Sequence, residues 1–367
     1  MSDAQSRALD DAFLGIVARW RAGGEGCDDA QFEAHALALC AYQLERNVPY
    51  ARYAASLGVD GARLPRTWGD IPAVPASGFK DATLATFDPT RAEAEFHTSG
   101  TTADVAGKHY LERVALYDAA LLAGFDRFML ADGARMRYLT FVPNPRRRPH
   151  SSLGYMMGHV SVLRGDGRAA YFLDDDAVDV EGFVRALQAA SDESQAVCIA
   201  GTAFAFAALT DALAARGSPL AAPAGSRIME TGGFKGRART VEPQELYARL
   251  SAALAIPVHD IVAEYGMTEL VSQYYDTHAS RRQATRVKTG PPWLRTLVVD
   301  TGGREVPLGE TGFLRHVDLG NRSSVVAIET EDRGYRTPDG FVLLGRDAPA
   351  PPRGCSLDAE DLLAARR

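Results

Sequence analysis

The chain has 367 residues, of which 46% are hydrophobic and 24% charged, a composition that excludes a disordered, collagen-like or coiled-coil protein. Lys and Arg number 40 against 47 Asp and Glu, so the net charge of −7 argues against general binding to nucleic acid or anionic lipid. No apolar run approaches the roughly 20 residues of a membrane span, and the start lacks a signal-peptide pattern, so we expect a cytoplasmic protein.

The first part of the chain has the apolar spacing of helices. Leu9 and Phe13 recur at a helical interval, and Asp28 is placed to cap a second helix. Two prolines make residues 71–75 an extended connector. We therefore predict a helical N-terminal segment over residues 1–95.

The strongest local signal is TSGTTADVAGK, residues 98–108. Small hydroxyl residues around glycine can turn backbone N–H groups toward an anion, and a following lysine supplies positive charge for phosphate. An ordinary surface turn rich in Ser, Thr and Gly is the alternative. The candidate phosphate-binding residues are Ser99, Gly100, Thr101, Thr102 and Lys108.

Further along, short apolar strands alternate with helices. Three predicted strands, at residues 195–200, 226–230 and 260–264, are each followed by a glycine-containing loop and a predicted helix. In a mostly parallel sheet such loops meet at one edge, where ligands bind. We predict an α/β core over residues 96–290.

The third of these strands leads into EYGMTE, residues 264–269. A helix is predicted to begin at Met267, which places Thr268 and Glu269 in its first turn, where an anion is favoured. A carboxylate beside a phosphate commonly shares a bridging Mg²⁺. Simple N-capping by Thr268 is the alternative.

The last part of the chain divides in two. Short β-prone runs predict a small β subdomain and hinge over residues 291–347, and a proline-rich tail over residues 348–367 carries Cys355. A thiol close to Arg353 has positive charge at hand and can act as a nucleophile, while a surface cysteine in a frayed tail is the alternative. The fold class that these elements predict is α/β.

The remaining cysteines are assigned to structure. The four cysteines form no CxxC pair, which argues against a disulfide framework or a zinc site. Cys198 lies in an apolar strand and is predicted to be a core residue, and Cys27 and Cys40 belong to the helical segment.

Several motifs in a fixed order carry a family resemblance. The segments 98–108, 231–233 (TGG), 264–269, 330–334 (TEDRG) and 344–347 (LGRD) resemble the motifs of the adenylate-forming superfamily of acyl-CoA synthetases, adenylation domains and luciferases. The resemblance implies that superfamily's N-terminal α/β domain with a small β subdomain.

The resemblance narrows to one branch. Only a short stretch follows the hinge, so a full C-terminal domain is expected to be lacking, and a cysteine lies close to the C-terminus. These features resemble the acyl-protein synthetase (LuxE-type) branch, whose members carry an acyl-accepting cysteine there. The chain departs from the superfamily pattern at Ala103, where glycine is usual, and this leaves the role of Lys108 open.

The resemblance implies ATP and Mg²⁺ as cofactors. Thr268 would contact the α-phosphate, Glu269 would ligate Mg²⁺, and Lys108 would hold phosphates. The other residues assigned to the nucleotide are Gly232, Gly233, Tyr265, Gly266, Asp332 and Arg346.

The implied function is ATP-dependent activation of a carboxylic acid, a fatty acid in the resembled branch, as an acyl-adenylate. The acyl group would pass to Cys355 as a thioester and on to a protein partner such as an acyl reductase or carrier. One alternative is a PaaK-like acyl-CoA or acyl-carrier-protein ligase that uses an external thiol. Another is a non-catalytic adenylate-binding subunit.

Three further features have both a functional and a structural interpretation. His150 can gate a site or simply be hydrogen-bonded. The basic run at residues 146–148 can dock an acidic partner or form a solvated loop. Met156 and Met157 can line an acyl pocket or belong to the core.

Overall fold

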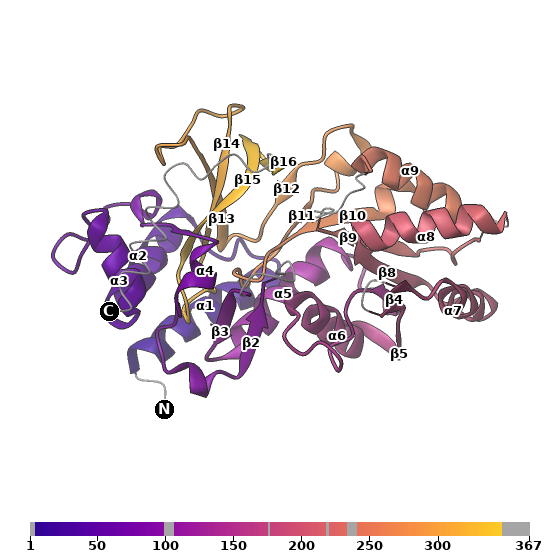
Figure 1. Cartoon of the computed structure of the whole chain (residues 1–367), viewed down its shortest axis with the longest axis horizontal. Helices are drawn as coiled ribbons and strands as arrows, with labels where there is room; N and C mark the ends of the chain where they lie inside the picture. Colours follow the sequence, from indigo (N-terminus) through magenta and orange to yellow (C-terminus); the bar gives the residue numbers. More distant parts are fainter. Residues whose placement is uncertain (1–3, 99–105, 175–176, 218–219, 233–240, 347–367) are drawn as a thin grey trace. The chain divides into compact units, whose positions relative to one another are not determined.

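The computed structural model describes residues 4–98, 106–174, 177–217, 220–232 and 241–346. Within them the chain forms two compact units (Figure 1). The terminal unit takes its residues from 1–123, 267–273 and 290–367, and the central unit from 124–266 and 274–289. The division of the chain into the four segments given above stays a prediction.

The central unit is built on one sheet with the strand order β12-β11-β10-β9-β8-β4-β5. The pairs from β10 to β5 are parallel, and β11 and β12 are added antiparallel. The strands are β4 (Met136–Phe141), β5 (Gly165–Tyr171), β8 (Val197–Thr202), β9 (Arg227–Thr231), β10 (Ile261–Tyr265), β11 (Tyr274–Asp276) and β12 (Lys288–Thr289), with a separate hairpin of β6 (Leu173–Asp174) and β7 (Ala177–Val178). The three predicted parallel strands are thus confirmed as β8, β9 and β10.

Helices cover both faces of this sheet. The helices and short 3-10 turns that contribute to the unit are α5 (Val114–Phe128), α6 (Ser152–Arg164), α7 (Val180–Asp192), α8 (Ala203–Arg216), α9 (Pro243–Leu254), η3 (Val258–Asp260) and η4 (Ser280–Arg282), of which α5 begins in the terminal unit. Because both faces are covered, every residue of β4 and β10 is buried.

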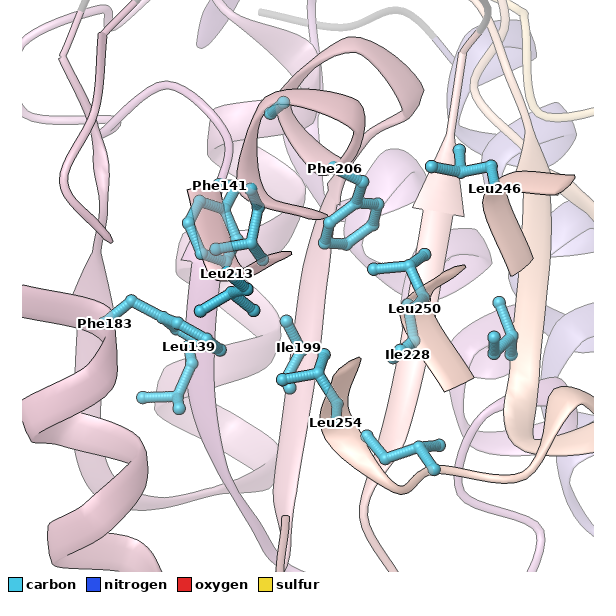
Figure 2. Close-up of a cluster of buried hydrophobic side chains, with 14 of the residues drawn as sticks. Leu139, Phe141, Phe183, Ile199, Phe206, Leu213, Ile228, Leu246, Leu250 and Leu254 are labelled. Atoms are coloured by element: carbon cyan, nitrogen blue, oxygen red, sulfur yellow. The ribbon is translucent and has the colours of Figure 1, made fainter. Parts of the chain in front are cut away.

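The main core of the central unit lies between the sheet and α7, α8 and α9 (Figure 2). Phe141 of β4 meets Phe183 of α7, with ring centroids 5.0 Å apart, and Phe206 of α8 at 5.9 Å. Tyr138, three positions before Phe141, faces Phe125 of α5 instead, as the two-residue period of a strand requires. Burying each such side chain contributes about 1.5–3 kcal/mol.

The first predicted glycine loop is wrong in detail. Gly201 and Thr202 belong to β8, and α8 begins at the next residue. The Thr202 hydroxyl accepts the N–H of Ala205 at 3.2 Å, so this threonine caps the helix directly from the end of the strand.

The terminal unit contains an antiparallel sheet with the order β13-β14-β15-β16, and β1 pairs in parallel with β15. Its elements are α1 (Ala4–Arg21), α2 (Asp29–Arg46), α3 (Val48–Ser56), η1 (Trp68–Asp70), β1 (Val74–Pro75), α4 (Gly78–Asp81), η2 (Pro89–Arg91), the hairpin β2 (Ala94–His97) and β3 (Lys108–Leu111), β13 (Leu294–Val299), β14 (Thr311–Asp318), β15 (Ala327–Thr337) and β16 (Gly340–Arg346). Asp28 caps α2 as predicted, because its carboxylate accepts the N–H of Gln31 at 2.8 Å.

The N-terminal helices pack against the C-terminal part of the chain. Phe13 and Trp20 of α1 contact Trp293 edge-on, with ring centroids 5.9 and 5.2 Å apart. Asp10 of the same helix, fully buried, forms an ion pair with buried Arg322 at 2.6 Å. The two stretches predicted as separate domains therefore share one compact unit. Among the helices in the described ranges, none combines the length and apolarity that crossing a membrane requires.

Candidate active site

The predicted phosphate loop joins β2 to β3. Its two ends are tied together, since the Thr98 N–H donates to the Gly107 carbonyl at 2.8 Å and the Gly107 N–H donates to the Thr98 hydroxyl at 2.8 Å. The loop residues Ser99, Gly100, Thr101 and Thr102 lie outside the described residues. Their roles stay predictions.

Lys108 opens β3 and has a carboxylate partner on β2. Its ammonium group lies 2.9 Å from the Glu95 carboxylate, which is also 2.6 Å from Nε2 of His97. The hydrogen bond to Glu95 raises the pKa of the Lys108 amine, so the amine stays protonated at neutral pH. About half of the Lys108 side chain is exposed. Glu95 is not among the predicted site residues, although a Glu and a Lys on paired strands are a signal for such a contact.

The predicted helix start at Met267 is wrong. Residues 266–273 form turns between β10 and β11. The cause is Asp318 at the end of β14, whose carboxylate accepts the N–H groups of Val271 at 2.9 Å and Ser272 at 2.8 Å, and the Ser272 hydroxyl at 2.9 Å. A side chain far away in sequence thus takes backbone donors that a helix would use itself.

Thr268 and Glu269 therefore lie in a turn and not at a helix terminus. The Thr268 hydroxyl is 3.4 Å from the carbonyl oxygen of His97, at the end of β2. Glu269 is buried, with only 7% of the residue exposed. A carboxylate is a hard oxygen ligand that suits Mg²⁺, and a hydroxyl can donate a hydrogen bond to a phosphate oxygen. Glu269 and Thr268 therefore fit a magnesium ion and a phosphate.

Two other predicted nucleotide residues are brought together in the terminal unit. Asp332 on β15 is paired with Arg346 on β16, and the Arg346 Nε donates to the Asp332 carboxylate at 2.7 Å. Asp332 is well covered, whereas about half of the Arg346 side chain is exposed. A ribose hydroxyl at Asp332 would share this carboxylate with the guanidinium group.

The residues predicted to flank the adenine lie in the central unit. Gly232 follows β9 and Tyr265 ends β10, and the register of these parallel strands places both at the same sheet edge, as predicted. Gly232 has a φ of 64°, a left-handed conformation that favours glycine. Tyr265 is buried, with its ring 6.0 Å from that of Tyr274. Gly266 directly follows it, outside the strand.

A buried charged cluster on the central sheet was not predicted. Asp276 pairs with Lys288 at 2.8 Å and with Arg286 at 2.7 Å. On β9, burial raises the pKa of Glu230 to about 7, and the Tyr247 hydroxyl donates to its carboxyl group at 3.0 Å. Glu230 is therefore close to half-protonated at neutral pH.

The thiols that the structure describes are poor nucleophiles. Cys27, Cys40 and Cys198 are all buried. Burial raises the pKa of Cys40 to about 11 and that of Cys198 to about 12, which keeps them protonated. Cys355 and Gly233 lie outside the described residues, so the acceptor role of Cys355 stays a prediction.

The three features with two interpretations are placed as follows. His150 and the basic residues 146–148 are exposed in the segment between β4 and α6. Met156 and Met157 are buried in α6. Gating, partner docking and an acyl pocket at these positions stay hypotheses.

Comparisons with known proteins agree with the motifs. No protein-family model matches the chain. The long-chain-fatty-acid–luciferin-component ligase of Vibrio harveyi is 22% identical over 301 residues, which are 80% of this chain and 76% of that protein. The open conformation of 2-hydroxyisobutyryl-CoA ligase, solved with 2-HIB-AMP and CoA, is 16% identical with a TM-score of 0.62, over 87% of this chain and 69% of that one. ATP-bound MatB from Rhodopseudomonas palustris is also 16% identical, with a TM-score of 0.51, over 71% of this chain and 49% of its own.

The fold is that of the adenylate-forming ligases, which confirms the predicted α/β class. The relative found by sequence is itself named a ligase. The chain thus has the fold of the adenylate-forming ligases and is similar in sequence to a ligase. Within that class, the predicted resemblance to the acyl-protein synthetase branch is confirmed by the similarity to the Vibrio harveyi enzyme.

Proposed function

We propose that the protein activates a fatty acid with ATP and Mg²⁺, transfers the acyl group to its own Cys355 and passes it to a protein partner. The observation that carries this proposal is the Thr268–Glu269 turn, which presents a hydroxyl and a carboxylate in a fold of adenylate-forming ligases. The name of the Vibrio harveyi relative supports a long-chain fatty acid as the substrate class.

In the first step, an oxygen of the substrate carboxylate attacks the α-phosphorus of ATP. The bond from that phosphorus to the bridging oxygen breaks, and pyrophosphate leaves. Lys108 and the preceding loop would hold the phosphates, Thr268 would donate to the α-phosphate, and Asp332 would accept from the ribose hydroxyls. Glu269 would hold Mg²⁺, which when bound neutralises phosphate charge.

In the second step, the Cys355 thiolate attacks the acyl carbonyl carbon, the bond to the AMP oxygen breaks, and AMP leaves. Arg353 lies two residues away in the sequence, and a positive charge there favours the thiolate. The resulting thioester keeps the acyl group activated for a partner such as an acyl reductase or a carrier.

The test is the intact mass of the protein after incubation with ATP, Mg²⁺ and a panel of fatty and aryl acids. Wild type and the buried-thiol control Cys27→Ala should gain a hydroxylamine-labile acyl mass, and Cys355→Ala should not. An acyl mass that persists in Cys355→Ala would contradict the self-acylation step.

The same incubation separates the alternatives. Pyrophosphate release without any acyl mass would indicate a ligase that uses an external thiol. Nucleotide binding without pyrophosphate release would indicate a non-catalytic adenylate-binding subunit.

A further inference from the structure

Two side chains from distant parts of the sequence hold the backbone of the Thr268–Glu269 turn. Nδ1 of His109 donates to the Thr268 carbonyl oxygen at 2.7 Å. The amide nitrogen of Asn321 donates to the Glu269 carbonyl oxygen at 2.8 Å. His109 and Asn321 also contact each other, with Nε2 of the imidazole 2.9 Å from Oδ1 of the amide. The four residues thereby form a closed ring of contacts, which we call the carbonyl clamp.

The clamp itself is rigidly held. His109 lies on β3 and Asn321 in the turn after β14, and both are fully buried. The rings of His109 and Phe79 are nearly perpendicular, with centroids 5.8 Å apart. Buried polar groups keep their hydrogen bonds because no water is available to replace them, so the imidazole Nδ1 and the Asn321 amide nitrogen stay on the Thr268 and Glu269 carbonyls.

The geometry of a peptide chain makes this clamp specific for Glu269. The Thr268 carbonyl belongs to the peptide plane before the Glu269 Cα, and the Glu269 carbonyl belongs to the plane after it. Since peptide groups are planar, holding both carbonyl oxygens restricts φ and ψ of Glu269 and therefore the direction of its Cα–Cβ bond. A helix would do this with its own backbone, and in this turn the two side chains do it instead.

We propose that His109 and Asn321 are positioning residues for adenylation, which aim the Glu269 carboxylate and the Thr268 hydroxyl at the phosphates. This inference rests on the proposed function of the two turn residues. Asp318 holds the later residues Val271 and Ser272, so the clamp is the part of the network that orients Glu269.

The test compares Asn321→Asp with Asn47→Asp. In Asn321→Asp a carboxylate oxygen replaces the N–H donor and faces the Glu269 carbonyl. Asn47 is the matched control, because it is also fully buried in the terminal unit and donates to a carbonyl, that of Ser324, at 3.2 Å, while accepting the Tyr50 N–H. The exchange of pyrophosphate into ATP in the presence of the fatty acid gives kcat and the KM for ATP. Amide hydrogen exchange reports on the backbone of residues 267–273.

We expect Asn321→Asp to lower kcat about 10- to 100-fold, since misplacement of a reacting group has effects of this size, with the KM for ATP unchanged. Amide exchange in residues 267–273 should become faster. Asn47→Asp should leave kcat and the exchange of that segment at their wild-type values. An equal loss of kcat in both variants, or unchanged exchange in Asn321→Asp, would overturn the inference.

A second pair of variants tests the positioning role if Asn321→Asp does not fold. The amide nitrogen of His109→Asn can stand near the Nδ1 position and keep the Thr268 contact, and that of His109→Gln can stand near Nε2 and keep the Asn321 contact. Each should lose part of kcat, and wild-type kcat in both would overturn the inference. If wild type itself exchanges no pyrophosphate, the proposed function fails, and amide exchange in the same variants still tests the clamp.

Discussion

The central unit is assembled from neighbouring stretches of chain, whereas the terminal unit joins stretches that lie far apart in the sequence. In the central unit β4, β8 and β9 are followed along the chain by α6, α8 and α9, and the core between the sheet and α7, α8 and α9 is apolar (Figure 2). In the terminal unit Arg322 pairs with Asp10 over a separation of 312 residues, and His109 contacts Asn321 over 212.

This difference matters for the site. The turn that carries Thr268 and Glu269 belongs to the terminal unit, although the chain on both sides of it belongs to the central unit. It is held there by buried polar side chains, which bind only one arrangement of partners. The apolar core of the central unit follows from local sequence patterns, whereas the position of this turn depends on polar contacts between distant parts of the chain.

The largest expected effect comes from removing the charge of Arg322, which joins α1 to the turn after β14. Arg322→Met removes one of two guanidinium partners from buried Asp10, which keeps Arg113, and from Glu112, which keeps Arg91, and costs about 3 kcal/mol. Arg304→Met, at an exposed pair with Asp300, should change stability by less than about 0.5 kcal/mol. Urea unfolding of the two variants measures the contrast, and equal losses would show that the terminal unit does not depend on its buried ion pair.

A pH-dependent effect of similar size is expected in the central unit. Burial raises the pKa of Glu230 to about 7 from its usual 4.5, so the folded protein holds a proton that the unfolded chain releases between these values. Stability from this group is therefore complete below pH 4.5 and is lost as the pH rises through 7, by about 3 kcal/mol.

Glu230→Gln replaces the carboxyl group with an amide, which stays neutral over this pH range. Urea unfolding should give nearly equal stability for wild type and variant near pH 4.5, and a variant that is more stable by about 3 kcal/mol at pH 8. Parallel stability curves for the two proteins across this range would contradict the assignment.

The same contrast explains which parts of the fold could be predicted. The strands β8, β9 and β10 and the helices α8 and α9 follow from apolar runs and helical spacing within a few residues, and those signals are local. The helix at Met267 was predicted from equally local signals, and it is absent because Asp318, some fifty residues later, binds the backbone there. A side chain from another part of the fold overrides propensity in a way that no local pattern shows.

The residues of the candidate site show the same difference between local and distant signals. Thr268, Glu269 and Lys108 could be proposed as site residues because their motifs are continuous in sequence. His109, Asn321 and Glu95 were not, because each is defined by a partner on another strand or turn. A histidine directly after Lys108 and an asparagine in a turn carry no signal of their own, so their roles follow only from the folded contacts.

The smallest predicted effect tests whether the two units respond separately. Ile228 on β9 and Ile328 on β15 are both fully buried, one in each unit. Replacing either by valine removes one methylene group and should cost about 0.5–1.5 kcal/mol. Because compact units open as separate cooperative segments, Ile228→Val should speed amide exchange in the central strands alone, and Ile328→Val in the terminal strands alone. Faster exchange in both units from either variant would show that the chain opens as one cooperative structure, and that the difference between the two units concerns their assembly and not their stability.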